Sequence, residues 1–171
     1  RGLGDVYKRQ GYYALSANTT GTYNTAIGVQ AMHQTTTSSR GTAVGYFALD
    51  NSNSGDRNTA IGFQSLTANT TGAYNTGVGD ASLEANTTAN YCTAVGQAAL
   101  ATNTTASYNT AVGAFALDAN STGASNTAVG LHALGATTTG SQNTAVGVEA
   151  LNANTTASNN TAIGFRALLN N

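Results

Sequence analysis

The chain repeats itself every 17 residues, and this period limits its fold more than any other feature of the sequence. A tetrapeptide T-A-[IV]-G, with one glycine in the alanine position, recurs without insertion or deletion. The consensus unit is N-T-A-[IV]-G-x-x-A-L-x-A-N-T-T-G-x-x. A fixed period means that each unit occupies an equivalent place in a stack. The last residue of the tetrapeptide is Gly28, Gly45, Gly62, Gly79, Gly96, Gly113, Gly130, Gly147 and Gly164.

A 17-residue period is too short for a helical-hairpin repeat or a leucine-rich horseshoe, but it suits one coil of a β-solenoid. We therefore predict an all-β fold, a parallel β-solenoid (β-roll) whose coils advance by ~4.8 Å each. The complete absence of proline agrees with this, because every coil must donate N–H groups to a neighbour. The N-T-A-[IV]-G segment is the predicted strand. The x-x-A-L-x segment is either one short helical turn per coil or a second short strand.

Two apolar columns are predicted to form the core. The residue before the glycine is always Ile or Val, from Ile27 to Ile163, and the residue four positions after it is Leu in all units but Met32. Ala26 and its equivalents point to the other face of the strand, which is then apolar on both sides. Such a thin core indicates that a partner chain covers the alanine face. The invariant glycine indicates a positive φ or a close contact, and the structural role of this column is a turn.

The first ten residues are set apart from the array. Residues 5–10 read DVYKRQ, which resembles the translation of a transposase adapter used to prepare sequencing libraries. We interpret residues 1–10 as an adapter-like artefact and residues 11–171 as a single array of about nine and a half coils. We expect this array to be truncated at both ends.

Composition excludes several classes of function. Only 8% of the residues are charged and the net charge is -1, so the chain lacks the basic face of a nucleic-acid binder. The sequence contains no run of about 18 consecutive apolar residues, which is the length that a membrane-spanning helix needs. The single cysteine, Cys92, cannot build a disulfide scaffold. No phosphate-binding glycine loop or catalytic triad spacing is present, and we predict no cofactor, no metal site and no enzymatic activity.

The N-T-A-[IV]-G units resemble the head repeats of YadA-like trimeric autotransporter adhesins. They are still more similar to the N-T-A-[IV]-G-x-x-A-L-x-x-N-T-T-G arrays of bacteriophage tail fibres, and the resemblance covers residues 11–171. It implies a parallel β-roll that assembles as a homotrimer and serves as an extended fibre or adhesin head. It also implies an extracellular location on a virion or a bacterial surface, with a host-surface glycan or protein as partner. The 17-residue coil is longer than in the YadA-like pattern.

One aromatic column is a candidate ligand site. Tyr74, Tyr91 and Tyr108 occupy one column on consecutive coils, and Tyr23 lies earlier in it. Their rings are expected near stacking distance, where they either contact sugar rings or stabilise the solenoid. We favour the structural interpretation of this ladder.

The remaining candidates have simpler interpretations. Asp50, Glu84 and Asp118 share a column at every second coil, and without a cleft we expect a solvated face rather than a catalytic pair. His33 and His132 are expected on the surface, and Cys92 as a free thiol on a corner. The asparagines that begin N-[TS]-T sequences are expected to form side-chain ladders rather than glycosylation sites. They are Asn18, Asn69, Asn86, Asn103, Asn120 and Asn154.

Three hypotheses for function therefore remain. The first is a structural or adhesive segment of a trimeric fibre. The second is an ice-binding solenoid, which needs outward threonines in a T-x-T spacing, whereas Thr70 and Thr71 are adjacent. The third is a carbohydrate-processing enzyme built on a solenoid, for which no site is evident.

Overall fold

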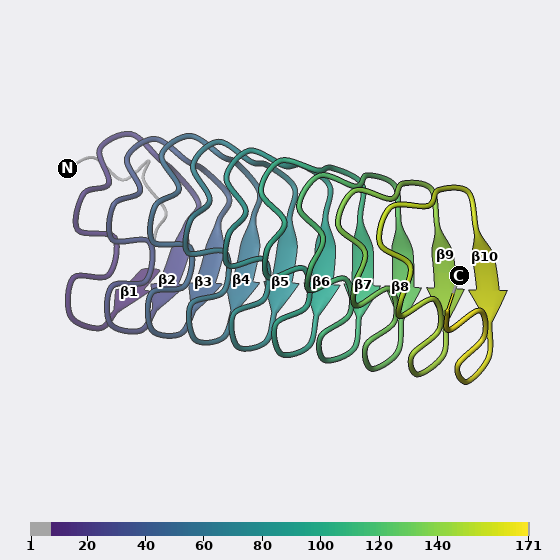
Figure 1. Cartoon of the computed structure of the whole chain (residues 1–171). Coiled ribbons are helices and arrows are strands. Elements are labelled where there is room, and N and C mark those ends of the chain that lie inside the picture. Colours follow the sequence, from purple (N-terminus) through teal and green to yellow (C-terminus); the bar gives the residue numbers. More distant parts are fainter. Residues whose placement is uncertain (1–7, 171) are drawn as a thin grey trace.

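The computed structural model describes residues 8–170 as a rod of stacked coils, each of which contributes one short strand to a single parallel sheet (Figure 1). The sheet has ten strands in sequence order, so each strand pairs only with the preceding and following coils. This confirms the predicted all-β parallel solenoid of 17-residue coils. The strands are β1 (Lys8–Gln10), β2 (Thr25–Ile27), β3 (Thr42–Val44), β4 (Thr59–Ile61), β5 (Thr76–Val78), β6 (Thr93–Val95), β7 (Thr110–Val112), β8 (Thr127–Val129), β9 (Thr144–Val146) and β10 (Thr161–Ile163).

Every sequence column becomes a ladder in space because the register between coils never changes. Thr93 pairs with Thr110 and Val95 with Val112, and the same 17-residue offset joins all neighbouring strands. β1 continues the sheet by pairing with β2, although all three of its side chains are exposed. Residues 1–7 of the adapter-like segment lie outside the described residues.

The segment after the glycine is neither a helical turn nor a second strand, and the described residues contain no helix. In the coil that follows β6, Ala98 and Leu100 both have a φ of 53°. Left-handed backbone costs a non-glycine residue about 1–2 kcal/mol, but ladder hydrogen bonds hold it in every coil. Ala98 N–H donates to Asp80 O at 2.8 Å, and Leu100 N–H donates to Ala116 O at 3.0 Å.

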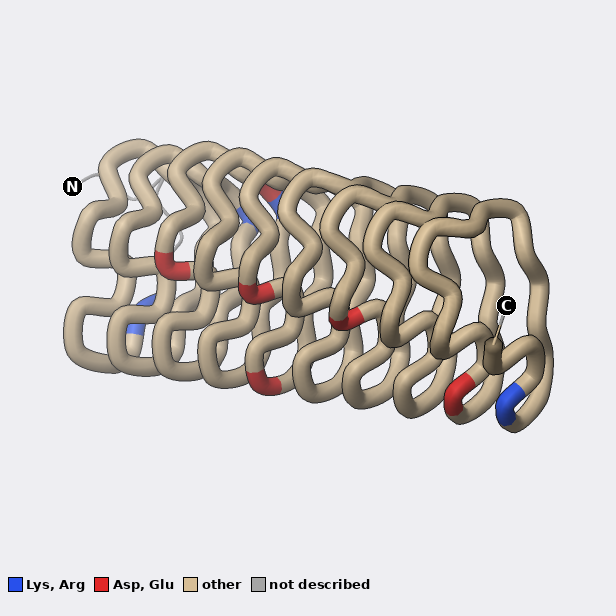
Figure 2. Tube along the Cα trace, viewed as in Figure 1, with Lys and Arg blue, Asp and Glu red and all other residues tan. Residues whose placement is uncertain are grey.

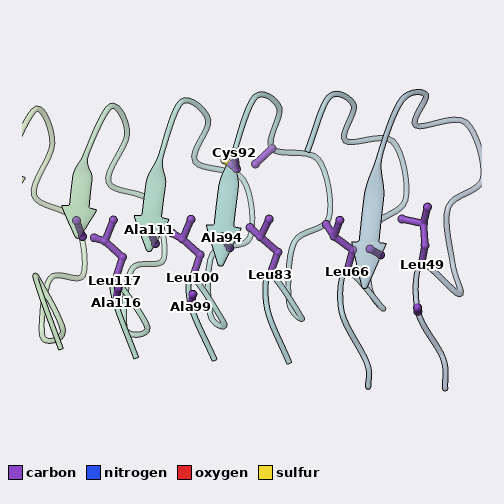
Figure 3. Packing of buried hydrophobic residues seen from close by; sticks show 14 of the residues in the cluster. Leu49, Leu66, Leu83, Cys92, Ala94, Ala99, Leu100, Ala111, Ala116 and Leu117 are labelled. Carbon is purple, nitrogen blue, oxygen red and sulfur yellow. The ribbon is translucent and has the colours of Figure 1, made fainter. Parts of the chain in front are cut away.

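The apolar core lies between this turn and the inner face of the sheet. Ala94, Ala99 and Leu100 are fully buried, and the leucines of successive coils form a row along the rod (Figure 3). Val95 is 37% exposed, so the predicted core role of the Ile/Val column is wrong. The predicted partner role of the alanine column is wrong as well, because these alanines face inward. Leucine fills the narrow coil from the opposite wall, which leaves space for only a methyl group on the strand.

The invariant glycine satisfies both reasons given for its presence. Gly96 has a φ of 136°, and a Cβ added to it would lie 2.5 Å from Gly113 O in the next coil. A Cβ on Gly72, ten residues after Gly62, would also approach a carbonyl closely, 2.4 Å from Ala89 O, but no positive φ is required there. Alanine already occupies that column at Ala89, so small shifts of the backbone accommodate it.

The other half of the rod interior is filled with amides. Asn86 Nδ2 donates to Asn69 Oδ1 at 2.8 Å, and equivalent bonds continue to Asn103 and Asn120, which confirms the predicted asparagine ladder for these four residues. The second asparagine column bonds to backbone instead: Asn75 Nδ2 donates to Ala89 O at 2.7 Å, and Asn75 Oδ1 accepts from Cys92 N–H at 2.9 Å. All these asparagines are fully buried. The ladders therefore run inside the rod, where the asparagine amides donate to the turn carbonyls the hydrogen bonds that water cannot supply.

Candidate functional site

The outer face of the sheet carries an apolar column along the whole rod. Because alanine points inward, the Thr and the Ile or Val on either side of it point outward. We call the Ile/Val column the outer sheet stripe. Ile27 and Val146 are 41% and 36% exposed near its two ends. Its exposed members are Ile27, Ile61, Val95, Val112, Val129, Val146 and Ile163.

A second apolar column follows the glycine and flanks the stripe. It holds exposed Val29, Tyr46 and Phe63 in one part of the rod, and Leu131, Val148 and Phe165 in another. Tyr46 and Phe63 stack with ring centroids 5.5 Å apart and an interplanar angle of 8°. Asp80, Gln97 and Ala114 interrupt this column in the middle.

The tyrosine column forms the predicted ladder. Tyr74 and Tyr91 stack at 4.9 Å and 16°, and Tyr91 and Tyr108 stack at 5.5 Å and 3°. All three are exposed. Tyr23 is separated from them by Arg40 and Arg57, which occupy the same column in the intervening coils. Because the rings face one another, the ladder presents mainly ring edges and hydroxyl groups to solvent.

The tyrosine column has a charged end. The guanidinium of Arg57 lies over the ring of Tyr74, 4.9 Å from the centroid, and also donates a hydrogen bond to the Tyr74 hydroxyl. Arg40 lies 6.0 Å from the Tyr23 ring in the same way. Arginine at this position thus continues the ladder as a planar group stacked on the aromatic face.

The first member of the acidic column, Asp50, does not lie on the solvated face that the sequence predicted. Asp50 is only 3% exposed. Its Oδ1 lies 3.5 Å from His33 Nδ1, and its Oδ2 accepts from Gln34 Nε2 at 3.3 Å. Burial raises the pKa of Asp50, although Gln34 and His33 oppose the shift. His33 is partly buried against this carboxylate rather than freely exposed.

The other members of this column do not join Asp50 in one site. Glu84 and Asp118 follow two and four coils later, and both are partly exposed. Burial raises the pKa of Asp118, and the charge of His132 opposes this. His132 is partly buried and stacks on Phe115 with centroids 5.1 Å apart. Within residues 8–170, no three His, Cys, Asp or Glu side chains gather closely enough to hold a metal ion.

Cys92 is a free thiol, as predicted, but it lies inside the rod rather than on a corner. Its Sγ donates to Ala106 O at 3.3 Å, in the place where an asparagine amide stands in the neighbouring coils. Burial raises the pKa of this thiol, which disfavours the reactive thiolate. The asparagines of the N-[TS]-T sequences in the middle coils, such as Asn86 and Asn103, are also fully buried and inaccessible for glycosylation in the folded rod.

The rest of the described surface offers little concentrated charge (Figure 2). A hollow of about 280 Å³ is lined by Lys8, Arg9, Gln10, Thr25 and Ile27. Its first three residues lie in the adapter-like segment, outside the repeat array. None of the described elements is a helix able to span a membrane.

Comparisons of the chain with protein-family models, with curated proteins and with solved structures found no match.

Proposed function

We propose that the chain is a structural and adhesive segment of a homotrimeric extracellular fibre, either a phage tail fibre or a bacterial adhesin head. The observation that carries the proposal is the outer sheet stripe. A column of exposed Ile and Val that runs along a whole rod leaves a large apolar surface uncovered, and such surfaces are typical of protein interfaces.

The partner that best fits this stripe is another copy of the chain. The Ile/Val side chains recur at every coil from β2 to β10, with a spacing of ~4.8 Å, over nine strands. A partner surface with the same coil spacing can place one apolar group against each Ile or Val of the stripe. A second copy of the chain has this spacing because its sequence has the same repeat. The number three rests on the resemblance of the N-T-A-[IV]-G units to trimeric heads and fibres.

The oligomeric state of the full chain tests the proposal. We expect analytical ultracentrifugation to give the mass of a trimer at micromolar concentration. The double variant Val112→Lys, Val129→Lys places two charges in the outer sheet stripe and should convert the trimer to a folded monomer. Its matched control, Thr105→Lys with Thr122→Lys, adds the same charge on the exposed threonine column and should leave the trimer intact. A folded wild-type monomer would contradict the proposal.

A second candidate, an ice-binding surface, is favoured by the same outward face. The strands present a threonine column, such as Thr110 and Thr127, beside the Ile/Val column in a T-x-[IV] spacing. The adjacent Thr70 and Thr71 do not bear on this face. Thermal hysteresis of a monomeric wild-type chain, abolished by Thr110→Tyr with Thr127→Tyr but not by Thr105→Tyr, would support ice binding. Absence of hysteresis rejects it.

A further inference from the structure

We propose that the rod binds a neutral pyranose ring on the free face of Tyr108. The tyrosine ladder ends there, because the next residue of the column is Ser125. One face of the Tyr108 ring is covered by Tyr91 at 5.5 Å, and Tyr108 is 62% exposed. The face toward Ser125 has no aromatic or cationic partner among the described residues.

The opposite end of the ladder shows what a closed end looks like. Arg57 lies over Tyr74, on the face turned away from Tyr91, so Tyr74 has ring or guanidinium contacts on both faces. Tyr91 lies between two tyrosines. Of the three candidate residues predicted from the sequence, only Tyr108 therefore keeps a ring face for a ligand.

The column beyond Tyr108 leaves room for one ring. Ser125 has a short side chain, and the next residue of the column, Gln142, is two coil steps from Tyr108, or about 9.6 Å by the strand spacing. A ring midway lies ~4.8 Å from Tyr108, within the range of about 4.5–7 Å for aromatic ring contacts. The ligand thus takes the place in the stack that a tyrosine at position 125 would fill.

The chemistry around this gap favours a neutral sugar. Residues 58–165 contain four acidic residues and no Lys or Arg, so phosphates and acidic sugars have no cation to bind. Ser125 and Gln142 are exposed and supply a hydroxyl and an amide, which hydrogen bond to sugar hydroxyls. The ring C–H groups of a β-glucopyranose carry partial positive charge and complement the negative face of Tyr108.

This proposal deepens the adhesive part of the proposed function and rests on it for its biological role. The site itself lies outside the outer sheet stripe, so its test does not depend on the trimer. The variant with Val112→Lys and Val129→Lys should bind sugar as the wild type does, whatever its oligomeric state. A failure of the trimer proposal and a failure of the sugar site are thereby distinguished.

Cellohexaose is the probe, and NMR of the tyrosine ring signals of the full chain is the measurement. We expect saturable shifts of Tyr108 with one site per chain. Ser125→Arg should cap Tyr108 from the following coil, as Arg40 lies over Tyr23, and weaken binding at least tenfold. Asn159→Arg, which adds the same charge to the same column two coils farther on, should bind like the wild type. Arg57→Ser should expose Tyr74 and create a second site.

Several outcomes overturn the proposal. One is the absence of saturable Tyr108 shifts, with folding confirmed by unchanged methyl signals. Another is equal weakening by Ser125→Arg and Asn159→Arg, which indicates a general effect of charge. Saturation of Tyr108 by choline chloride but not by cellohexaose would identify a cation site instead of a sugar site.

Discussion

The interior of the rod has an apolar half and an amide half, and in the middle coils both are fully buried. Near the strands, Leu83 and its equivalents pack against the alanines of the sheet (Figure 3). Under the T-T-G turn, Asn86 and its equivalents fill the same cross-section with hydrogen-bonded amides. Leu83 and Asn86 are only three residues apart, and both are fully buried.

The two halves stabilise the stack in different ways. The apolar half contributes non-directional burial, which tolerates small shifts of one coil against the next. The amide half contributes directional bonds: the single carbonyl of Gly72 accepts from Asn58 Nδ2 at 2.7 Å and from Asn69 Nδ2 at 2.9 Å. Such bonds are lost when a coil slips by one residue. We infer that the leucines supply most of the stability and the asparagines fix the register.

Placing an amide in the apolar half, or a leucine in the amide half, should destabilise the rod. The largest effect is expected for Leu83→Asn. The substitution removes a buried leucine and places an amide where no polar partner is available. We expect a loss of about 4 kcal/mol in the free energy of unfolding, measured by urea denaturation. Leu83→Met, which imitates Met32, is the control and should cost about 1 kcal/mol. A loss below that of the control would refute an apolar half.

The reverse exchange, Asn86→Leu, should cost less, about 2 kcal/mol. It removes the donor to Asn69 Oδ1 and the acceptor for Asn103 Nδ2. Ala89 O keeps its bond from Asn75, so one carbonyl is not left unpaired. Urea denaturation again gives the value. Asn86→Ser, a residue found in this column at Ser52, should lose less than Asn86→Leu; the opposite order would contradict the amide half.

Asp50 lies where the two halves meet, and its ionisation should lower stability. Burial raises the folded-state pKa of Asp50 above its ordinary value of 3.8, so its contribution favours folding below pH 3.8 and is lost as pH rises through the folded pKa. Asp50→Asn should therefore raise the melting temperature at pH 7 by a few degrees, about 1 kcal/mol, and change it little at pH 3. An equal effect at both pH values would show that ionisation is not the cause.

The smallest effect is expected for Cys92→Asn, which should stabilise the rod by about 0.5–1 kcal/mol. An asparagine would donate to Ala106 O and offer an amide oxygen to Asn109 N–H, as Asn109 does for Asn126 N–H at 2.9 Å. Sulfur is a weak acceptor in that place. Thermal unfolding of Cys92→Asn and of the control Cys92→Ala measures the difference. A melting temperature of Cys92→Asn at or below that of the control would show that the asparagine bonds of this column do not stabilise the rod.

Some irregularities of the repeat make sense only in three dimensions. Gly41 stands in an asparagine column, and a Cβ there would lie 2.7 Å from the Met32 methyl group, which fills the missing amide's space. Gly77 replaces a strand alanine where Ser65 and Ser82 lie beneath it, with their hydroxyls 2.9 Å apart. In the sequence each exception stands alone. In the structure Gly41 lies against the longer Met32, and Gly77 lies against the two serines, so the larger side chain fills the space that the glycine leaves.

The sequence by itself determined the solenoid, the parallel register and the stacking of Tyr74, Tyr91 and Tyr108. A fixed period places equivalent residues one strand spacing apart, so these features follow from counting. Only the tertiary structure decided which face of the strand is inside. Alternation places Ala94 and Val95 on opposite faces but does not say which face is buried. The width of the coil decides it, because Leu100 reaches across from the turn and leaves space for a methyl group alone. The burial of Asp50 was likewise decided only by the tertiary structure, whereas the end of the tyrosine ladder at Tyr108 follows from its column, in which Ser125 comes next.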